Sequence, residues 1–348
     1  TWYQFRIPIF NYEGTVGDIS DFKTIRFMRM FMTGFKDTTF LRFARLDLIR
    51  GEWRRYQLPF TQGGEAWTGE EPTEGALAIS AVNIEENAGK EPVNYVLPPG
   101  FTRQIDPTQP QLRQLNEQSI VLKVYDLGDG DARAAYKNTE LDIRQYKKIR
   151  MEAHAEAVPG DVLGENELVA FIRLGTDYQD NYYEYEVPLQ LTPPGRYDND
   201  SESDRLIVWP KANQFEVTLD WFKEVKQARN RAMSDPESEV TINSVFSTID
   251  DDGNRISVSG NPNMSSIRTI MIGVRNPKAG DNPYGPDDGL PKTGEIWLNE
   301  LRLTDFNEKG GWAANGRATL KLADFGNVTF AGNTSQPGFG SIEQKVQE

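Results

Sequence analysis

Residues 149–157 alternate without a break between apolar and polar side chains, reading Ile-Arg-Met-Glu-Ala-His-Ala-Glu-Ala. Successive side chains of a β-strand point to opposite faces of a sheet, so a period of two predicts a strand with one buried face. Comparable short patterns recur along the chain, and only residues 220–232 have the spacing of an amphipathic helix. Because a parallel α/β sheet requires a helix after each strand, the sequence predicts mostly antiparallel β-sandwiches of the jelly-roll kind.

A two-strand pattern occurs twice in the chain. The first expected strand, residues 267–274, contains basic and apolar residues. The second expected strand, residues 295–303, carries an acidic residue just before its last leucines. Residues 25–32 and 41–48 repeat this combination. Such internal similarity indicates tandem copies of one domain type. The first copy reaches its closing strands by residue 50, so we expect it to lack its front half and to belong to a larger protein.

These patterns divide the chain into four expected parts. Residues 1–60 are predicted to be the C-terminal part of a first β-sandwich. Residues 61–118 are acidic and rich in proline, which favours a linker that crosses a surface. Residues 119–306 are predicted to form a second, nearly complete jelly-roll-like sandwich with one short helix. Residues 307–348 contain a terminal amphipathic β-hairpin and a tail.

The expected strands of the second sandwich are short and are separated by turn residues. They are residues 120–125, 149–157, 168–174, 182–189, 215–219, 240–249, 255–259, 267–274 and 295–303. The sequence Asp250-Asp-Asp-Gly253 predicts a hairpin turn, because aspartate and glycine favour such turns. In the earlier part of the chain, residues 2–10 and 76–84 also have strand patterns.

The terminal hairpin has two interpretations. Residues 317–325 alternate between apolar and polar side chains, and residues 328–330 continue the pattern after an expected turn at Gly326 and Asn327. This hairpin can close a soluble domain. It can also begin a membrane barrel, whose strands of about ten residues are apolar towards lipid and polar towards the lumen. The pattern fits both interpretations.

Composition limits the classes of partner and chemistry. The formal net charge of −14 argues against a nucleic-acid partner, whose phosphates would be repelled. Cysteine is absent, which excludes disulfides, cysteine-ligated zinc and thiol catalysis within these residues. The sequence also lacks a run of about 20 apolar residues, so we expect no membrane-spanning helix.

The titratable residues predict no catalytic, cofactor-binding or metal site. The single histidine, His154, lies between Glu152 and Glu156 on the polar face of its strand, where we expect a surface residue. Asp129 with Asp131 is the best of the weak calcium candidates, but no acidic cluster fits the twelve-residue calcium loop, so solvated turns are expected. The clusters are Asp126, Asp129 and Asp131; Asp198–Asp204; Asp250–Asp252; and Asp287 with Asp288.

Two other groups of side chains have alternative interpretations. Acidic residues on expected strands can form a glycosidase pair, although nothing in the sequence marks a cleft; they are Glu184, Glu186, Glu295 and Glu300. Aromatic residues can line a sugar-binding platform or pack across strands; they are Tyr178, Tyr182, Tyr183, Tyr185 and Trp209. We favour packing for Tyr183 and Tyr185, which share an apolar face, and leave Tyr182 open.

Several longer motifs are spread in order along the whole chain. They are residues 25–32, 41–48 with 51–56, 94–100, 141–156, 294–303, and 310–314 continuing to 322–324. In this order they resemble the SprA/Sov family of outer-membrane translocons, which serve type IX secretion and gliding motility.

The resemblance implies a non-catalytic soluble portion of a very large outer-membrane barrel, with the tail re-entering strands of the barrel type. It implies a location at the cell outer membrane, on its periplasmic or cell-surface side, and no cofactor. The implied partners are secreted cargo proteins with a C-terminal targeting domain, a PorV-type shuttle protein, a plug protein and, through the parent barrel, the outer membrane. Without the resemblance, a carbohydrate-binding β-sandwich module of an exported protein is the alternative, and a glycoside hydrolase or lyase ranks last.

Overall fold

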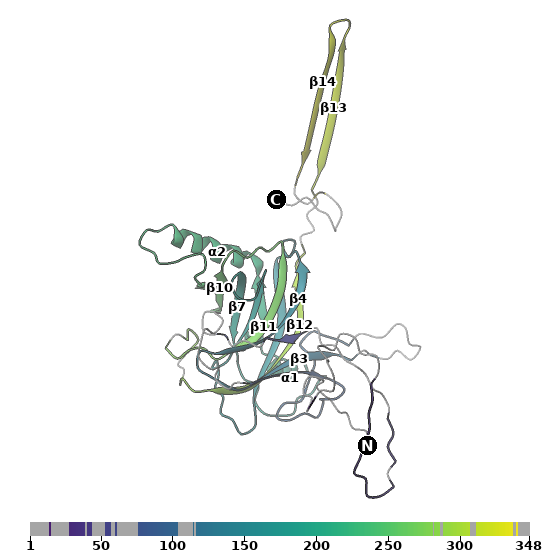
Figure 1. Ribbon diagram of the computed structural model, residues 1–348, viewed down its shortest axis with the longest axis vertical. Coiled ribbons are helices and arrows are strands. Elements are labelled where there is room, and N and C mark those ends of the chain that lie inside the picture. Colours follow the sequence, from purple (N-terminus) through teal and green to yellow (C-terminus); the bar gives the residue numbers. More distant parts are fainter. Residues whose placement is uncertain are drawn as a thin grey trace. The chain divides into compact units, whose positions relative to one another are not determined.

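In the computed structural model the chain forms two compact units, Thr1–Arg50 and Gly51–Glu348. Figure 1 shows the helices and strands of the second unit. The residues that the structure describes are 14, 28–38, 40–43, 53–56, 60, 76–103, 114, 116–280, 282–285, 288–306, 311–336 and 339. Residues 28–38 and 40–43 of the first unit are exposed and contain no regular secondary structure. The strands expected at 25–32 and 41–48 are therefore absent at residues 28–32 and 41–43, which are the positions of these ranges that the structure describes. The strand expected at 2–10 lies outside the described residues.

Two antiparallel sheets of the second unit form a sandwich, which confirms the predicted mostly-β fold. The larger sheet has the order β1 (Arg54–Arg55), β4 (Ala132–Leu141), β11 (Ile267–Arg275), β6 (Val169–Gly175), β7 (Tyr182–Pro188), β10 (Arg255–Ser259) and β9 (Phe246–Ile249). The smaller sheet has the order β2 (Ala76–Asn83), β3 (Gln118–Leu127), β12 (Lys292–Thr304), β5 (Lys148–Ala157) and β8 (Phe215–Thr218). Non-sequential neighbours in both sheets show that the chain crosses repeatedly between the two layers.

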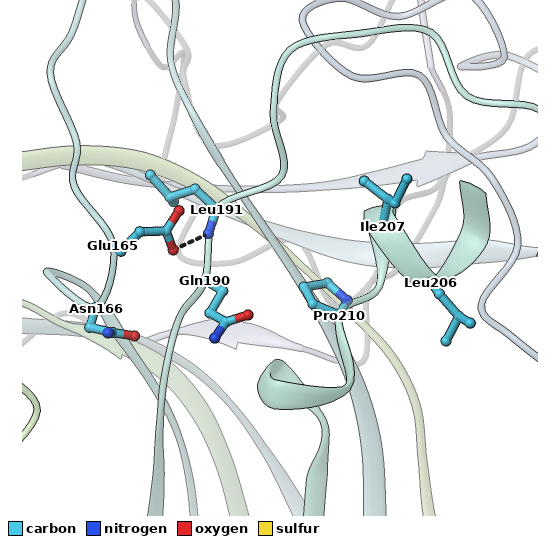
Figure 2. Close-up of a pocket in the computed structure, with 7 residues that line it drawn as sticks. All are labelled: Glu165, Asn166, Gln190, Leu191, Leu206, Ile207 and Pro210. Atoms are coloured by element: carbon cyan, nitrogen blue, oxygen red, sulfur yellow. Dashed lines mark hydrogen bonds between the residues drawn. The ribbon is translucent and has the colours of Figure 1, made fainter. Parts of the chain in front are cut away.

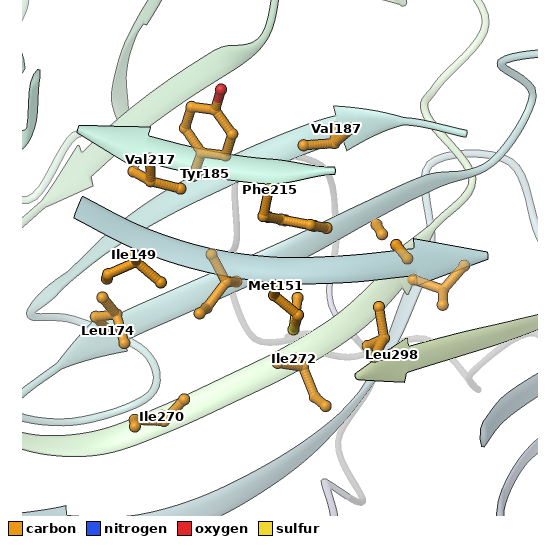
Figure 3. Close-up of a cluster of buried hydrophobic side chains, with 14 of the residues drawn as sticks. Ile149, Met151, Leu174, Tyr185, Val187, Phe215, Val217, Ile270, Ile272 and Leu298 are labelled. Carbon is orange, nitrogen blue, oxygen red and sulfur yellow. The ribbon is translucent and has the colours of Figure 1, made fainter. Parts of the chain in front are cut away.

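The hydrophobic core lies between these sheets (Figure 3). Alternate positions of each strand contribute to it, as the period of two requires. The labelled core residues in Figure 3 are Ile149, Met151, Leu174, Tyr185, Val187, Phe215, Val217, Ile270, Ile272 and Leu298. Strand β6 is buried along its whole length on both faces, which agrees with its nearly continuous apolar sequence.

Two helices flank the sheets. Helix α2 (Leu219–Met233) confirms the helix predicted at 220–232, and it buries Phe222 and Val225 against the sandwich. Helix α1 (Glu202–Val208) was not predicted because seven residues give too little periodicity. Ser201 caps it by accepting a hydrogen bond from the backbone N–H of Asp204. A 3₁₀ turn, η1 (Lys211–Asn213), follows.

Two strands differ from the sequence predictions. Strand β4 was missed because its alanine-rich sequence has weak strand propensity. The strand expected at 240–249 is confined to β9, and the turn after it is as predicted. Asp250 and Asn254 close this turn through a backbone hydrogen bond of 2.9 Å, and Gly253 has a φ of +87°.

Residues 76–103 are more closely tied to the sandwich than a surface linker would be. Strand β2, which the sequence predicted, pairs with β3 from Ala76↔Tyr125 to Asn83↔Gln118. The apolar run Val93, Tyr95, Val96 and Leu97 is buried instead of crossing an exposed surface. Its burial follows from contact with large aromatic side chains on the outer face of the smaller sheet. The four-part division of the chain itself stays a prediction.

The terminal hairpin consists of β13 (Ala313–Leu322) and β14 (Gly326–Ser335), which pair over ten residues each. All of these residues are exposed. The turn occupies residues 323–325, three residues earlier than expected, and Ala323 within it has a φ of +37°. The register places Leu320 opposite Val328 and Ala318 opposite Phe330, so one face of the ribbon is apolar.

None of the helices in the described part of the chain has the length and apolar content needed to cross a membrane.

Candidate functional site

The outer face of the smaller sheet carries a buried group of polar and aromatic side chains. On β5, Ile149, Met151 and Ala153 point into the core, while His154 and Glu156 lie on the opposite face. That outer face is covered by residues 93–97 and by the segment from Thr192 to Trp209, which together bury it. The strand is therefore buried on both faces and not on one alone. The expectation that His154 is a surface residue is wrong: it is 0% exposed.

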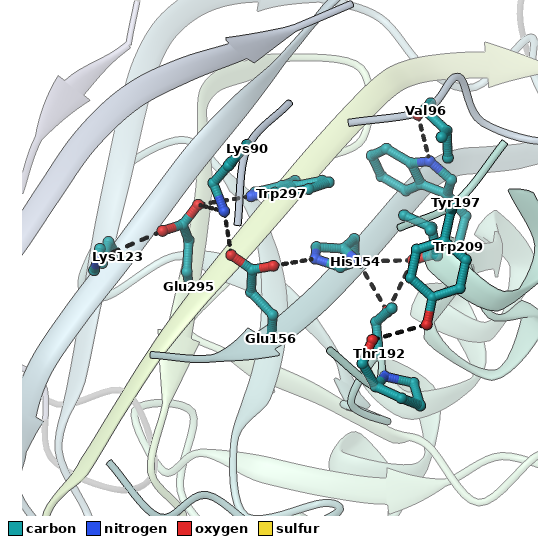
Figure 4. A network of polar contacts seen from close by, with 12 residues as sticks. Lys90, Val96, Lys123, His154, Glu156, Thr192, Tyr197, Trp209, Glu295 and Trp297 are labelled. Carbon is teal, nitrogen blue, oxygen red and sulfur yellow. Dashed lines mark hydrogen bonds and ion pairs between the residues drawn. The ribbon is translucent and has the colours of Figure 1, made fainter. Parts of the chain in front are cut away.

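His154 lies directly opposite Trp297 on the neighbouring strand β12. The two rings are in contact at 3.8 Å between centroids, and their planes are tilted by 30°. Nδ1 of His154 is 2.7 Å from the carbonyl oxygen of Val208, which can only accept, so Nδ1 donates. Thr192 Oγ1 lies 3.0 Å from the same nitrogen. His154 thus joins the end of α1 to the sheet (Figure 4).

Two glutamates face each other on β5 and β12, and two lysines neutralise them. Glu156 and Glu295 are directly opposed in the sheet register, an arrangement that is unfavourable for like charges. Lys90 forms ion pairs with both carboxylates, at 3.1 Å from Glu295 Oε1 and in close contact with Glu156. Lys123 lies 3.6 Å from Glu295 Oε2. Figure 4 shows Lys90 between the two carboxylates.

The environment of Glu295 lowers its pKa. Burial by itself would raise the pKa of this carboxyl. The Nε1–H of Trp297 donates to Oε1 at 2.9 Å, and the charges of Lys90 and Lys123 favour the ionised form. These contributions outweigh burial and hold the pKa below its ordinary value, so Glu295 is held as a carboxylate.

An aromatic contact fixes residues 93–97 over this face. The Nε1–H of Trp209 donates to the carbonyl oxygen of Val96 at 2.9 Å. The ring of Tyr95 packs against both Trp209 and Trp297, at 6.2 and 5.7 Å between centroids. Burial raises the pKa of Tyr95, whose hydroxyl is 2.9 Å from Ser119 Oγ. The polar group is therefore enclosed by a tightly packed aromatic layer.

The outer face of the larger sheet carries a second ionic group. Arg173 Nε donates to Glu184 at 2.7 Å, and Arg275 Nη2 donates to the other oxygen of Glu184 at 3.0 Å. Arg275 also contacts Glu186. Burial would raise the pKa of Glu184, but the two arginines lower it below its ordinary value. Both glutamates are thus occupied by arginines.

The structure separates the four proposed glycosidase acids. Glu184 and Glu186 belong to β7 of the larger sheet, whereas Glu295 and Glu300 belong to β12 of the smaller sheet. Three of them are paired with arginine or lysine, and Glu300 has a left-handed backbone with φ of +53°. No two of them from different sheets meet across a cleft in the described residues.

The acidic clusters mostly serve turns and helix caps. Asp129 accepts from the backbone N–H of Ala279 at 2.7 Å, and Asp131 is paired with Arg133 at 2.7 Å. Asp250 accepts from Tyr185 Oη–H at 2.7 Å. Across the described ranges, no group of three or more histidine, cysteine, aspartate or glutamate residues is placed to hold a metal ion.

The remaining acidic positions follow the same pattern. Asp198 accepts from the backbone N–H of Asp200 at 2.9 Å, and Asp204 accepts from the N–H of Asp198 at 2.8 Å. Asp288 forms an ion pair with Lys292 at 2.8 Å. Asp287 lies outside the described residues.

Four of the five proposed sugar-platform residues are buried. Tyr182, Tyr183, Tyr185 and Trp209 are at most 3% exposed. Tyr183 and Tyr185 pack in the core as predicted. The guanidinium of Arg173 covers the ring of Tyr182, with Cζ of Arg173 3.8 Å from the centroid of that ring. The interpretation of these four residues as a sugar-binding platform is therefore wrong, since their ring faces are not accessible. Tyr178 is half-buried and packs against other tyrosines.

An open surface depression of about 450 Å3 lies beside the C-terminal half of α1 (Figure 2). Its lining residues come from three separate segments of the chain. They are Glu165, Asn166, Gln190, Leu191, Leu206, Ile207 and Pro210. Sequence reasoning did not identify this depression, because it depends on the unpredicted helix α1 and on a loop that lies about forty residues before it.

Lys90, Thr192 and Trp297 were also not singled out as site residues from the sequence. The available signal was the aromatic-acidic sequence Glu295-Ile-Trp297, in which both ends lie on one face of a strand. Lys90 gave no local signal, since its partner Glu156 is 66 residues away.

Comparison with protein families connects this architecture to secretion. The model of the SprA_N family, described as motility related/secretion protein, matches residues 1–348. The chain therefore belongs to the SprA_N family of motility-related and secretion proteins. No curated protein matches the chain.

Proposed function

We propose that this chain is a non-catalytic structural portion of an outer-membrane translocon for type IX secretion and gliding motility. The observation that carries the proposal is the family match, which covers all 348 residues. The geometry supports it, because three of the four acidic residues that we considered for catalysis, Glu184, Glu186 and Glu295, are engaged by arginines or lysines. Rigid outer faces closed by ion pairs and aromatic contacts suit a scaffold that shapes a protein-conducting channel.

The hairpin supports a connection to the outer membrane. Strands of about ten residues, tilted by about 45°, are long enough to cross the hydrocarbon layer. The register of β13 and β14 gathers apolar side chains on one face and Arg317, Thr319 and Lys321 on the other. We propose that these strands join the membrane barrel of the parent protein, with the sandwich at its periplasmic or cell-surface side.

Labelling at single cysteines tests this membrane contact, since the chain has no cysteine of its own. A polarity-sensitive fluorophore at Leu320→Cys is expected to shift to shorter wavelength in outer membranes that contain the parent protein. The same fluorophore at Thr319→Cys, on the other face, is expected to shift less. Equal emission at both positions would contradict the proposed orientation.

The proposed partners are secreted cargo with a C-terminal targeting domain, a PorV-type shuttle protein and a plug protein. Cells that produce the parent protein without residues 119–306 test the role in export. We expect cargo to accumulate inside the cells and spreading on agar to stop, with the shortened protein still present in the outer membrane. Normal cargo export by such cells would count against the proposal.

A further inference from the structure

Helix α1 presents an unusual apolar surface to solvent. Leu206 and Ile207 are 49% and 45% exposed. Within the described part of Gly51–Glu348, they are the one pair of consecutive large apolar residues that are both exposed to this degree. With Pro210 they form the apolar wall of the depression beside α1, and Leu191 lines the side of Glu165 and Gln190. Covering such side chains releases water from apolar surface, so this wall favours an apolar group of a ligand.

The opposite side of the depression offers amide groups. Figure 2 shows the side-chain amides of Asn166 and Gln190 facing the side formed by Leu206, Ile207 and Pro210. Neither amide forms a hydrogen bond with any described residue. Each can therefore donate and accept at once, which is the pairing that a peptide group requires.

The backbone that carries these amides is held firmly. Buried Asn213 accepts from the N–H of Gln190 at 2.7 Å and donates to its carbonyl oxygen at 2.8 Å. Asn166 has a φ of +62° and donates its backbone N–H to Leu189 at 2.9 Å. The backbone of the amide side therefore needs little ordering when a ligand binds, which lowers the entropic cost of association.

The charge of the residues at the depression favours some peptide sequences over others. Glu165 is the one charged residue that lines the depression. One of its oxygens accepts from the N–H of Leu191 at 2.9 Å. Glu202 lies four residues before Leu206 and so shares its face of α1. Lys211 follows the helix but does not line the depression. Glu202 does not line the depression either, so the Glu165 carboxylate is the group that favours a basic ligand.

We propose that the depression beside α1 binds an extended peptide segment in which an aliphatic side chain is followed by lysine or arginine. The aliphatic side chain packs on Leu206 and Ile207, and the peptide groups pair with Asn166 and Gln190. The basic side chain approaches Glu165. The lining contains no aromatic ring to stack on a sugar and no cation to hold a phosphate. This inference does not depend on the role in secretion.

Methyl NMR spectra of the 348-residue chain test the site with the peptide acetyl-Ala-Leu-Lys-Ala-amide. Saturable shifts of the methyl groups of Leu191, Leu206 and Ile207 are expected. The counterpart with serine in place of leucine is expected to bind about ten-fold more weakly. Absence of shifts at millimolar peptide, or equal binding of the two peptides, would overturn the proposal.

Two matched variants separate the apolar and charged contributions. Ile207→Ser is expected to weaken binding about ten-fold, whereas Ile249→Ser, at an equally exposed isoleucine on β9, leaves it unchanged. Glu165→Gln retains an acceptor for Leu191 and removes the charge, so binding of the lysine peptide is expected to weaken about three-fold. Equal effects of both isoleucine variants, or full affinity in Glu165→Gln, would contradict the assigned contacts.

Discussion

Strands β5 and β13 have the same length and the same alternation, but their environments are opposite. Strand β5 is covered on both faces, so that even its polar residues His154 and Glu156 are buried. Strand β13 is exposed on both faces, including its apolar residues Leu320 and Leu322. A period of two therefore identifies a strand, but the segments that cover the strand decide what is buried.

The polar face of β5 tolerates burial because its charges are matched. Glu156 and Glu295 would repel each other, but Lys90, from a distant part of the chain, forms ion pairs with both, and Lys123 adds a second positive charge beside Glu295. The hairpin has no comparable network among the described residues, and Thr319 and Thr329 share one weak side-chain contact of 3.3 Å across it. We therefore expect substitutions in the sandwich to affect its folding much more than similar substitutions in the hairpin.

The largest contrast is expected between two tryptophans. Trp297→Ala removes a fully buried side chain that contacts His154, Tyr95 and Trp209. The free energy of unfolding is expected to fall by about 4 kcal/mol, as for other buried tryptophans. Trp312→Ala, where the side chain is 53% exposed, is expected to change it by less than about 0.5 kcal/mol. Urea unfolding followed by circular dichroism measures both free energies. Similar losses of unfolding free energy in the two variants would contradict the prediction.

A leucine pair gives the next largest difference. Leu298→Ala on β12 opens a cavity in the core, where the leucine is 2% exposed, and is expected to cost about 3 kcal/mol. Leu320→Ala in the hairpin is expected to cost less than about 0.5 kcal/mol for the sandwich transition. Thermal unfolding of both variants provides the comparison. A large shift for the Leu320 variant would show that the sandwich depends on the hairpin.

Local patterns were sufficient to predict the sandwich, helix α2 and the turn at Asp250, because these depend on spacing within a few residues. They were not sufficient for β4, whose alanines carry little strand signal. They also missed α1, which is short and relies on the cap at Ser201. The errors at these elements reflect weak local propensity.

The candidate site was harder to predict for a different reason. The burial of His154 results from contacts with Val208 and Thr192, which lie 54 and 38 residues away in the chain. The match between Lys90 and Glu156 spans 66 residues. Such pairings leave no trace in local periodicity, so an alternating polar face was interpreted as exposed.

A lysine pair tests whether the buried charges require matching. Lys90→Met leaves two opposed carboxylates without their shared cation. We expect a loss of about 2 kcal/mol, below the range for fully buried pairs because Lys90 is 18% exposed. Lys321→Met, on the exposed polar face of β13, is expected to be nearly neutral. Chemical unfolding at pH 7 compares them, and a neutral Lys90 variant would show that another group compensates the carboxylates.

The smallest expected effect is the dependence of stability on pH. The folded protein holds the pKa of Glu295 below its ordinary value, so the unfolded chain binds more protons in acid. The stabilising contribution of Glu295 is therefore complete above the unfolded pKa of about 4.3 and is lost as the pH falls through the lower folded pKa.

Glu295→Gln should reduce this acid sensitivity, because glutamine keeps an acceptor for Trp297 but has no proton to bind. The matched control is Glu237→Gln, at an exposed position after α2, which is expected to retain the wild-type profile. Unfolding free energies between pH 3 and pH 7 distinguish the two variants. An unchanged slope in Glu295→Gln would assign the acid sensitivity to other carboxylates, first to Glu184, whose pKa is lowered by Arg173 and Arg275 in spite of its burial.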